Sequence, residues 1–430
     1  MINNKEYDIV GYTKEEFLKI DQTTVLRSED SPTGYVVSFR WKAPDKNWLG
    51  VIGDWMFSDL YHSSHFTSGR YWPHEWQPGN FSHSLLGLKK TPEILLQKNS
   101  DKDVNPEKFE FDSDVLKLGL YEMVKEVETD IFICTIPLPS GIFNYRFVLE
   151  DPGEDAINMK TMPDPNNLPL LKDENEQRYS QIVIPFDKEK QLEDRSIELP
   201  YAGAMRGKVI YVPYETDSSF ALGKQTAGVY LPAQYDENRD EAYPVLYLSH
   251  GGGGSHSDWF TQGALNNILD HLIADGKVEP MIVITMNNEV FRWKNKTACI
   301  PNIINYLIPY LEERFHISKS PSRRSFAGFS AGGFLAFDLF SSYPADFKYF
   351  GIWSAGQRND VDFTKSELKF PEVHLGAGRY DDAYYSFGYQ LEDALYEHEI
   401  HFTSYFPEGG HQWSVWRKLL EDFVKRVLWN

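Results

Sequence analysis

Short apolar runs broken by turn residues characterise the first half of the chain. Between residues 33 and 184 five runs are rich in β-branched and aromatic residues: YVVSFRWKAP, WLGVIGDW, IFICTIPLP, FNYRFVLED and SQIVIPF. Several such runs in succession predict strands of an all-β sandwich. The stretch 58–122 between them, rich in His, Trp, Tyr, Ser and Gly, shows no clear strands. We interpret it as an elaborated loop or a source of cleft residues.

Beyond Val209 the pattern changes, because strand-like runs now alternate with helical ones. The expected strands are TAGVYLP, YPVLYLSH, PMIVITM, RSFAGFS, YFGIWSA, EVHLGAG and HFTSYFP, and helices are expected over 264–273, 301–311, 385–397 and 413–427 and after RSFAGFS. This alternation predicts an α/β domain, with a mostly parallel sheet covered by helices on both faces. The charged stretch 186–200 is aperiodic and is interpreted as the linker. The predicted domains are therefore 1–200, with the linker, and 201–430.

Composition supports two domains and limits the partners. A chain of 430 residues exceeds what one core usually serves, and 41% apolar residues can fill two. A net charge of −20 disfavours nucleic acid, whose phosphates require concentrated Lys and Arg. No segment approaches the ~18 consecutive apolar residues of a membrane helix. The sequence therefore predicts neither a nucleic-acid nor a membrane partner. It does not tell whether the protein is a monomer or an oligomer.

Cysteine usage and the start of the chain favour a reducing compartment. Cys134 and Cys299 lie far apart and share no metal-ligand spacing, so neither a disulfide framework nor a zinc site is predicted. The polar, acidic start MINNKEYDIVGYTKEEF is not typical of a signal peptide. We expect a cytoplasmic protein, or a secreted one if a leader has been removed.

The segment Gly328-Phe329-Ser330-Ala331-Gly332 matches the G-x-S-x-G pattern of a nucleophilic serine. It follows the apolar strand RSFAGF and precedes the helix GGFLAFDLF, which is the context that this motif requires. The sharp strand-to-helix turn holds the serine hydroxyl out at the carboxyl edge of the sheet, and the helix N-terminus favours developing negative charge. Ser330 is therefore the predicted nucleophile.

A run of glycines follows the strand YPVLYLS, as His250-Gly251-Gly252-Gly253-Gly254. In α/β-hydrolases this loop donates an N–H to the oxyanion hole, and glycines let the backbone approach a substrate carbonyl closely. The predicted donors are the N–H groups of Gly252 and Ala331.

A serine nucleophile needs a base, and the base needs an orienting carboxylate, in the chain order Ser, acid, His. Of the histidines after Ser330, we interpret His374, His398 and His401 as structural, because they lie in apparent strands or near a helix end. His411, in the strand-to-helix loop PEGGHQW, is the predicted base. Either Asp381 or Asp382, just past EVHLGAG, can supply the acid.

These residues predict a double displacement in which Ser330 is acylated and water then releases the acid, without a metal or organic cofactor. His62, His65, His74 and His83 show no recognisable ligand spacing, so we predict no metal site among them.

The block YPVLYLSHGGGGSHSDWFTQGALNNILDHLIADGKVEPMIVITM, with AGFSAGG and GGHQWSVWRKLLEDF, resembles carbohydrate esterase family 1, which contains feruloyl and acetyl-xylan esterases. It is also similar to the related enterochelin esterases. The resemblance implies an α/β-hydrolase fold and a triad of Ser330, His411 and Asp381, with Asp382 as the alternative acid. The sequence departs from the family pattern at Phe329 and Ala331, where relatives often carry Leu and Met, and at 287–289. We expect these positions to lie near the cleft.

The pieces VSFRWKAP, GDW, PLPSGIFNYRF and DPNN are similar to the immunoglobulin-like, glycan-module-type domain that precedes the catalytic domain in some of these esterases.

The first functional hypothesis is an esterase that releases hydroxycinnamate or acetate from plant-wall saccharides, supported by 15% aromatic residues. The alternatives are a siderophore trilactone esterase, an acyltransferase and a ligand-binding protein that has lost its chemistry. The expected partner is a small-molecule or oligosaccharide ester.

Overall fold

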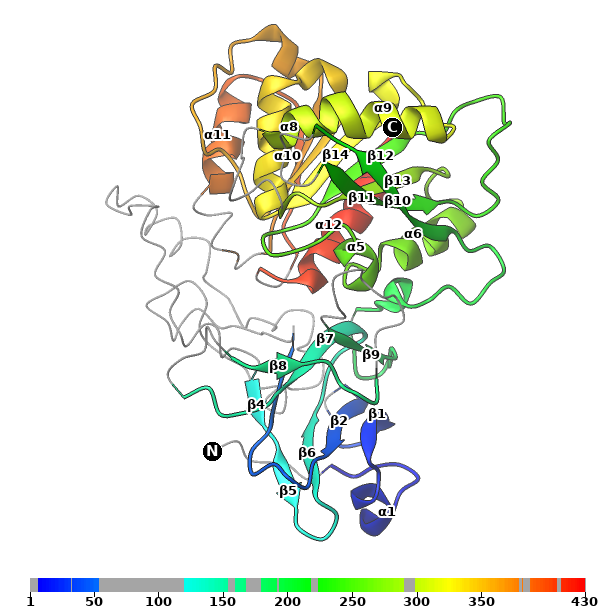
Figure 1. Cartoon of the computed structure of the whole chain (residues 1–430), viewed down its shortest axis with the longest axis vertical. Coiled ribbons are helices and arrows are strands. Elements are labelled where there is room, and N and C mark those ends of the chain that lie inside the picture. The colour runs from blue at the N-terminus through cyan, green and yellow to red at the C-terminus, as the bar shows by residue number, and fades with distance from the viewer. Residues whose placement is uncertain are drawn as a thin grey trace. The chain divides into compact units, whose positions relative to one another are not determined.

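The computed structural model forms two compact units (Figure 1). One comprises Met1–Leu199 with Glu408–Ser414, and the other comprises Pro200–Pro407 with Val415–Asn430. The stretch 58–122, apart from its last three residues, and the four histidines His62, His65, His74 and His83 lie outside the described residues. The structure describes residues 7–31, 33–53, 120–153, 159–167, 179–191, 193–217, 223–289, 298–378, 381, 387–407 and 411–429.

The first unit is built from two antiparallel sheets, as the alternation of its apolar runs predicts. One sheet has the strand order β1-β2-β6-β5 and the other β4-β3-β7-β8, with β9 paired to β7. The described elements are α1 (Lys14–Leu18), β1 (Gln22–Arg27), β2 (Tyr35–Lys42), β3 (Gly50–Gly53), β4 (Leu120–Glu122), β5 (Val124–Glu126), β6 (Ile131–Ile136), β7 (Gly141–Val148), β8 (Thr161–Met162), β9 (Ser180–Ile184) and η3 (Ser196–Glu198).

Aromatic side chains join these two sheets face to face. The rings of Phe39 on β2 and Tyr145 on β7 meet edge to face with centroids 4.9 Å apart, and Trp41 stacks on Phe147 at 5.3 Å. Such pairs add to the free energy gained from burying their area. The predicted all-β architecture is therefore confirmed as two sheets packed around an aromatic core.

The charged stretch 186–199 packs into this unit although its sequence resembles a linker. Gln191 is buried, accepts the N–H of Ser140 at 2.8 Å and donates to the carbonyl oxygen of Thr33 at 2.7 Å. Glu198 is buried, accepts the N–H of Ile142 and pairs with Arg195. These polar groups satisfy backbone donors and acceptors of the sandwich, which the charge composition does not predict.

The second unit contains an eight-stranded sheet with the order β10-β11-β13-β12-β14-β15-β16-β17. Strands β10 and β11 are antiparallel to their neighbours, and the pairs from β13 to β17 are parallel. The strands are β10 (Lys208–Glu215), β11 (Lys224–Leu231), β12 (Val245–Ser249), β13 (Ile282–Met286), β14 (Arg324–Phe329), β15 (Tyr349–Trp353), β16 (Glu372–Gly376) and β17 (Phe402–Tyr405). The predicted mostly parallel sheet is confirmed.

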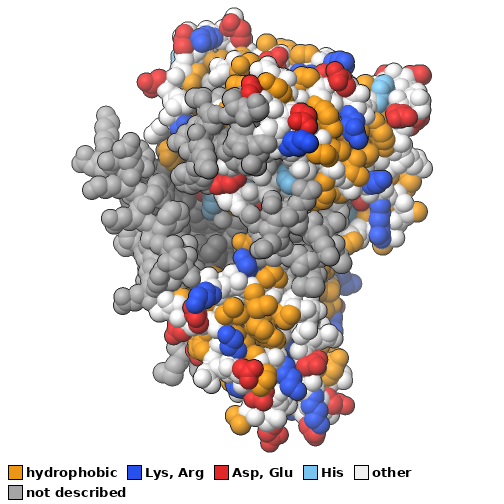
Figure 2. All heavy atoms as spheres, in the orientation of Figure 1, with side chains coloured by type: hydrophobic (Ala, Val, Ile, Leu, Met, Phe, Trp, Pro, Cys, Tyr) orange, Lys and Arg blue, Asp and Glu red, His pale blue; other side chains and the backbone are white. Residues whose placement is uncertain are grey.

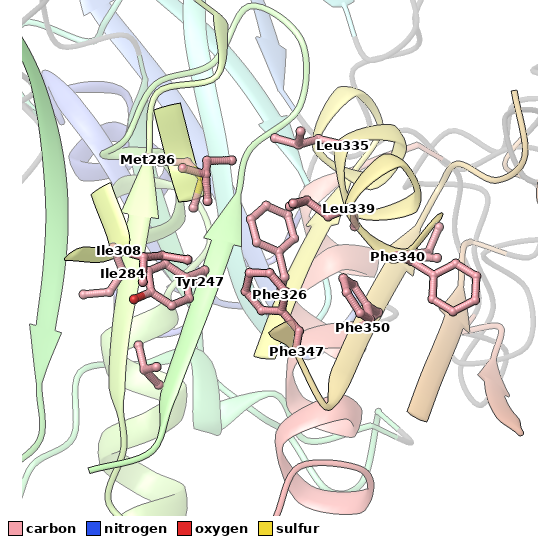
Figure 3. Close-up of a cluster of buried hydrophobic side chains, with 14 of the residues drawn as sticks. Tyr247, Ile284, Met286, Ile308, Phe326, Leu335, Leu339, Phe340, Phe347 and Phe350 are labelled. Carbon is pink, nitrogen blue, oxygen red and sulfur yellow. The ribbon is translucent and has the colours of Figure 1, made fainter. Parts of the chain in front are cut away.

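Helices cover both faces of this sheet (Figure 1). On one face the helices pack on a cluster that includes Tyr247, Ile284, Phe326, Leu339 and Phe350 (Figure 3). The helical segments are α5 (Asp258–Thr261), α6 (Leu265–Ala274), α8 (Cys299–Asn302), the π-helical η5 (Ile303–Leu307), α9 (Ile308–Arg314), η6 (Pro321–Arg323), α10 (Ala331–Ser342), η7 (Pro344–Asp346), η8 (Ser366–Lys369), α11 (Tyr389–Glu397) and α12 (Trp413–Arg426).

On the other face α12 is held by a buried polar group. His374 of β16 is fully buried, its Nδ1 accepts the indole N–H of Trp353 at 2.9 Å, and its Nε2 lies 3.1 Å from Asp422 on α12. Because Nδ1 accepts, the proton sits on Nε2 and donates to the carboxylate. Burial keeps the pKa of His374 below its ordinary value. The structural role expected for His374 fits this arrangement.

Basic and acidic side chains are interspersed on the described part of the face drawn in Figure 2. Ion pairs among the described residues include those of Arg358 with Asp338 and of Arg323 with Glu279. Exposed pairs of this kind contribute little to stability.

The buried imidazole of His374 predicts a pH-dependent stability. Its folded-state pKa lies below the ordinary value of 6.5, so the unfolded chain binds more protons as the pH falls through 6.5. The free energy of unfolding should therefore decrease from pH 7.5 to 5.5, and His374→Gln should flatten this slope in urea titrations. Val127→Ala, which alters an exposed side chain that does not titrate, should leave the slope unchanged. Equal slopes in wild type and His374→Gln would contradict the assignment.

Candidate active site

Ser330 occupies a strained backbone turn between β14 and α10. The strand ends at Phe329, the helix begins at Ala331, and Ser330 has φ 53° and ψ −119°. A non-glycine residue in this region costs about 1–3 kcal/mol, which the surrounding structure must offset. The Ser330 N–H donates to the carbonyl oxygen of Trp353 at 2.9 Å, and its carbonyl accepts the N–H of Phe334 at 3.0 Å. The strand-turn-helix context predicted from the motif is therefore present.

Three glycines around Ser330 allow this turn, because a side chain at any of these positions would collide with neighbouring backbone. A methyl group at Gly328 would lie 2.6 Å from the backbone of Gly332, and one at Gly332 would lie 2.6 Å from the carbonyl oxygen of His250. A methyl group at Gly333 would collide with the carbonyl oxygen of Trp353. The close approach of Gly332 to His250 brings the nucleophile turn against the glycine-rich loop.

The glycine-rich loop after β12 is a tight turn over Gly251–Gly254. The N–H of Gly254 donates to the carbonyl oxygen of Gly251 at 3.3 Å, and Gly253 has φ 72°. A positive φ at the third position of a β-turn favours glycine. Of the predicted donors, Gly252 lies in this turn and Ala331 opens α10.

Phe329, which we expect near the cleft, packs behind the nucleophile. Its side chain is buried, stacks on Trp416 with centroids 3.7 Å apart, and meets Trp259 edge to face at 5.4 Å. Its ring also contacts Gly251, where a Cβ would collide with it. One aromatic ring thus contacts the glycine-rich loop, α5 and α12. The departure from leucine marked this position in the sequence. The partners of Phe329 could not be predicted, because they lie far from it along the chain.

Trp416 connects this cluster to the ends of two further strands. Its indole N–H donates to the hydroxyl of Ser354 at 2.9 Å, and the Ser354 N–H donates to the carbonyl oxygen of Gly376 at 2.7 Å. Ser354 follows β15 and has φ 49°, and Gly376 ends β16. The ends of β14, β15 and β16 are thereby linked to α12.

Asp381 is fully buried after β16, and its N–H donates to the carbonyl oxygen of Gly378 at 2.9 Å. Asp382, the alternative acid, lies outside the described residues. His411 is exposed between β17 and α12. Its segment groups with the first unit, so its pairing with Ser330 and Asp381 stays a prediction.

The other histidines after Ser330 have structural partners. His398 stacks on Phe363 with centroids 5.8 Å apart, and His401 lies 2.5 Å from the carboxylate of Glu372. Glu372 is the first residue of β16, so this pair lies at the amino end of that strand. Both histidines stand apart from the carboxyl ends of the strands.

No cluster of three or more His, Cys, Asp or Glu side chains that could hold a metal occurs within the described ranges. Cys134 and Cys299 are buried free thiols, and burial raises the pKa of each to about 12. Among the described helices, none combines the length and apolar character needed to cross a membrane.

Comparison with known proteins shows which proteins the chain is similar to. Residues 219–360 match the family model Esterase, described as a putative esterase. The chain is 29% identical over 245 residues to an endo-1,4-beta-xylanase/feruloyl esterase of Xylanibacter ruminicola, covering 51% of this chain and 31% of that protein. It is 36% identical over 124 residues to endo-1,4-beta-xylanase Y of Acetivibrio thermocellus, covering 26% and 11%. The chain thus spans less than a third of the length of these relatives.

A solved structure resembles nearly the whole chain. The enterobactin esterase of Shigella flexneri, crystallised in the presence of enterobactin, superposes with a TM-score of 0.57 at 14% identity, covering 97% of this chain and 98% of that one. At this identity the likeness shows the fold. The second unit therefore has an α/β-hydrolase fold, and residues 219–360 within it match the Esterase family model. The predicted resemblance to feruloyl esterases is confirmed by the family model and the xylanase/feruloyl esterase relative, and the likeness to an enterobactin esterase is confirmed for the fold.

The aromatic cluster predicts that Phe329→Leu destabilises the protein. Leucine loses the stacking face against Trp416 and leaves a cavity beside Trp259, which should cost about 1–3 kcal/mol. Urea unfolding followed by tryptophan fluorescence measures the loss. Phe370→Leu is the matched control, because Phe370 is 41% exposed and should change stability by less than about 0.5 kcal/mol. An equal loss in both variants would argue against the cluster.

Proposed function

We propose that this chain is a serine carboxylic-ester hydrolase with Ser330 as its nucleophile. The observation that carries the proposal is the strained backbone of Ser330 between a buried strand and a helix, within the residues that match an esterase family. A serine held in this way presents its hydroxyl at the carboxyl edge of the sheet. The glycine-rich loop that packs against Gly332 supplies the second part of the site.

The topology of the sheet supports a triad of Ser330, Asp381 and His411. Phe329, Trp353, Gly376 and Tyr405 are consecutive partners across β14, β15, β16 and β17, and all four strands are parallel. Residues that follow parallel strands meet at one edge, where α/β proteins bind their ligands. Ser330 follows β14, Asp381 follows β16 and His411 follows β17.

In the proposed mechanism His411 takes the hydroxyl proton of Ser330 as its oxygen attacks the ester carbonyl. The N–H groups of Gly252 and Ala331 stabilise the tetrahedral oxyanion. The alcohol leaves with a proton from His411, and a water molecule activated by the same imidazole releases the acid. Asp381 orients the imidazole and stabilises its positive form.

For the substrate, we propose a feruloyl, related hydroxycinnamoyl or acetyl ester of a plant-wall saccharide. The name of the Xylanibacter ruminicola relative, which combines xylanase and feruloyl esterase, supports this class. An enterobactin-type trilactone is the second candidate, supported by the likeness of nearly the whole chain to an enterobactin esterase. The net charge of −20 favours the first, since a catecholate trilactone is anionic. We propose that the β-sandwich unit is an immunoglobulin-like, glycan-module-type domain.

Ser330→Ala should remove nearly all turnover while leaving folding intact, because the substitution deletes only the nucleophilic oxygen. Steady-state hydrolysis of methyl ferulate, an aryl acetate, an acetylated xylo-oligosaccharide and a ferric catecholate trilactone by wild type and variant measures it. Loss of ferulate or acetate turnover in Ser330→Ala supports the saccharide-ester proposal. Preference for the trilactone favours the second candidate. Ligand binding without Ser330-dependent turnover would instead indicate a binding protein that has lost its chemistry.

Matched substitutions of two neighbouring aspartates test which of them orients the catalytic histidine. Asp381→Asn should lower kcat by about 10²–10⁴-fold with residual activity, because the imidazole loses its orienting carboxylate. Asp382→Asn should stay within a few fold of wild type. The reverse result would transfer the role to Asp382, and full activity of both variants would refute a triad acid at this loop.

A further inference from the structure

The imidazole of His250 bridges two backbone segments at the glycine-rich loop. The ring is buried, its Nδ1 lies 2.6 Å from the carbonyl oxygen of Gly251, and its Nε2 accepts the backbone N–H of Asn288 at 3.2 Å. Because Nε2 receives an N–H, it carries no proton in the neutral ring. The proton is therefore on Nδ1 and is donated to Gly251.

The carbonyl of Gly251 and the N–H of Gly252 belong to the same peptide group. A trans peptide is planar, so its C=O and N–H point in opposite directions. A hydrogen bond that fixes the direction of the Gly251 carbonyl therefore also fixes the direction of the Gly252 N–H. Accepting a hydrogen bond at the carbonyl further polarises the peptide and strengthens its N–H as a donor.

The neighbouring amides of the turn are used for its own structure. The N–H of Gly254 donates to Gly251, and the N–H of Gly253 donates to the Glu289 carboxylate at 2.8 Å. The N–H of the second residue of a β-turn takes no part in the turn's hydrogen bond. Gly252 holds that position, so its N–H is the one that the turn leaves for a ligand.

Asn288 ties the same loop to the end of β13. Its side-chain amide donates to the hydroxyl of Ser249 at 2.8 Å and to the carbonyl oxygen of His250 at 3.1 Å, and the residue is buried. The carbonyl of His250 also faces Gly332 of the nucleophile turn. Asn288 therefore holds the segment that sets the distance between the loop and Ser330.

We propose that His250 and Asn288 are positioning residues for the oxyanion hole. The N–H of Asn288 orients the ring of His250, and the ring orients the Gly251–Gly252 peptide toward the developing oxyanion. This inference rests on the proposed ester hydrolysis and on Gly252 as a donor. Neither side chain is assigned a contact with substrate, so their loss should affect kcat more than KM.

Two substitutions divide the functions of the ring. His250→Asn places an amide near Nδ1, where it can still donate to Gly251. His250→Gln places its amide near Nε2, where it can accept from Asn288 but leaves Gly251 without this donor. We expect kcat for an aryl acetate to fall by about 10–100-fold in His250→Gln, with KM within about threefold, and by less in His250→Asn. His401→Gln is the control and should match wild type.

A transition-state analogue gives an independent measurement. An aryl boronic acid forms a tetrahedral adduct with the serine and uses the oxyanion hole, so its inhibition constant should rise in His250→Gln about as much as kcat/KM falls. Wild-type kcat and unchanged boronate affinity in this variant would overturn the inference. If the His250 variants do not fold, Asn288→Ala is measured in their place, with kcat expected to fall by about tenfold. An unchanged kcat there would equally overturn it.

The Ser330→Ala experiment separates this inference from the proposed function. If wild-type turnover does not depend on Ser330, the proposed function fails, and the oxyanion assignment fails with it. If turnover depends on Ser330 but not on the donor at position 250, only the positioning role fails.

Discussion

The backbone of Ser330 is the constraint on which the rest of the second unit depends. Its φ of 53° cannot persist unless the strand before it and the helix after it are both held firmly. The parallel sheet holds β14 on two sides, and Gly328, Gly332 and Gly333 let α10 begin in direct contact with neighbouring backbone. A side chain at any of these glycines would push the helix away from the strand. The strain is therefore stored where the chemistry needs an exposed hydroxyl.

Aromatic packing extends this constraint from the nucleophile turn to the neighbouring strands. Phe329 precedes Ser330 and stacks on Trp416 of α12, whose indole reaches Ser354 beyond β15. Since α12 follows the loop of His411, one contiguous set of rings backs both the nucleophile and the helix next to the predicted base. Interiors packed this closely transmit small displacements. Phe329 thus joins the nucleophile turn to α12 through direct ring contact.

Local patterns made the sheet, its helices and the Ser330 turn predictable, because each depends on residues that are adjacent in sequence. The roles of Phe329 and Asn288 were not predictable, since their partners come from other strands and helices and no periodicity reports them. The packing of residues in the predicted linker, 186–200, was not predictable for a related reason. The charges of this stretch resemble those of a solvated linker, but Gln191 and Glu198 are buried against backbone groups of the sandwich. Composition alone cannot distinguish an exposed charge from one that satisfies a buried partner.

Accessibility explains why a well-formed histidine–carboxylate pair need not be catalytic. His374 and Asp422 lie at hydrogen-bond distance, as a catalytic pair would, but Trp353 occupies the second nitrogen and the ring is fully buried. His250 has both nitrogens engaged by backbone groups. A general base must reach the serine hydroxyl with one nitrogen while a carboxylate holds the other. Neither ring can meet that requirement without losing a buried hydrogen bond. The exposed His411, beyond the carboxyl end of β17, stays the predicted base.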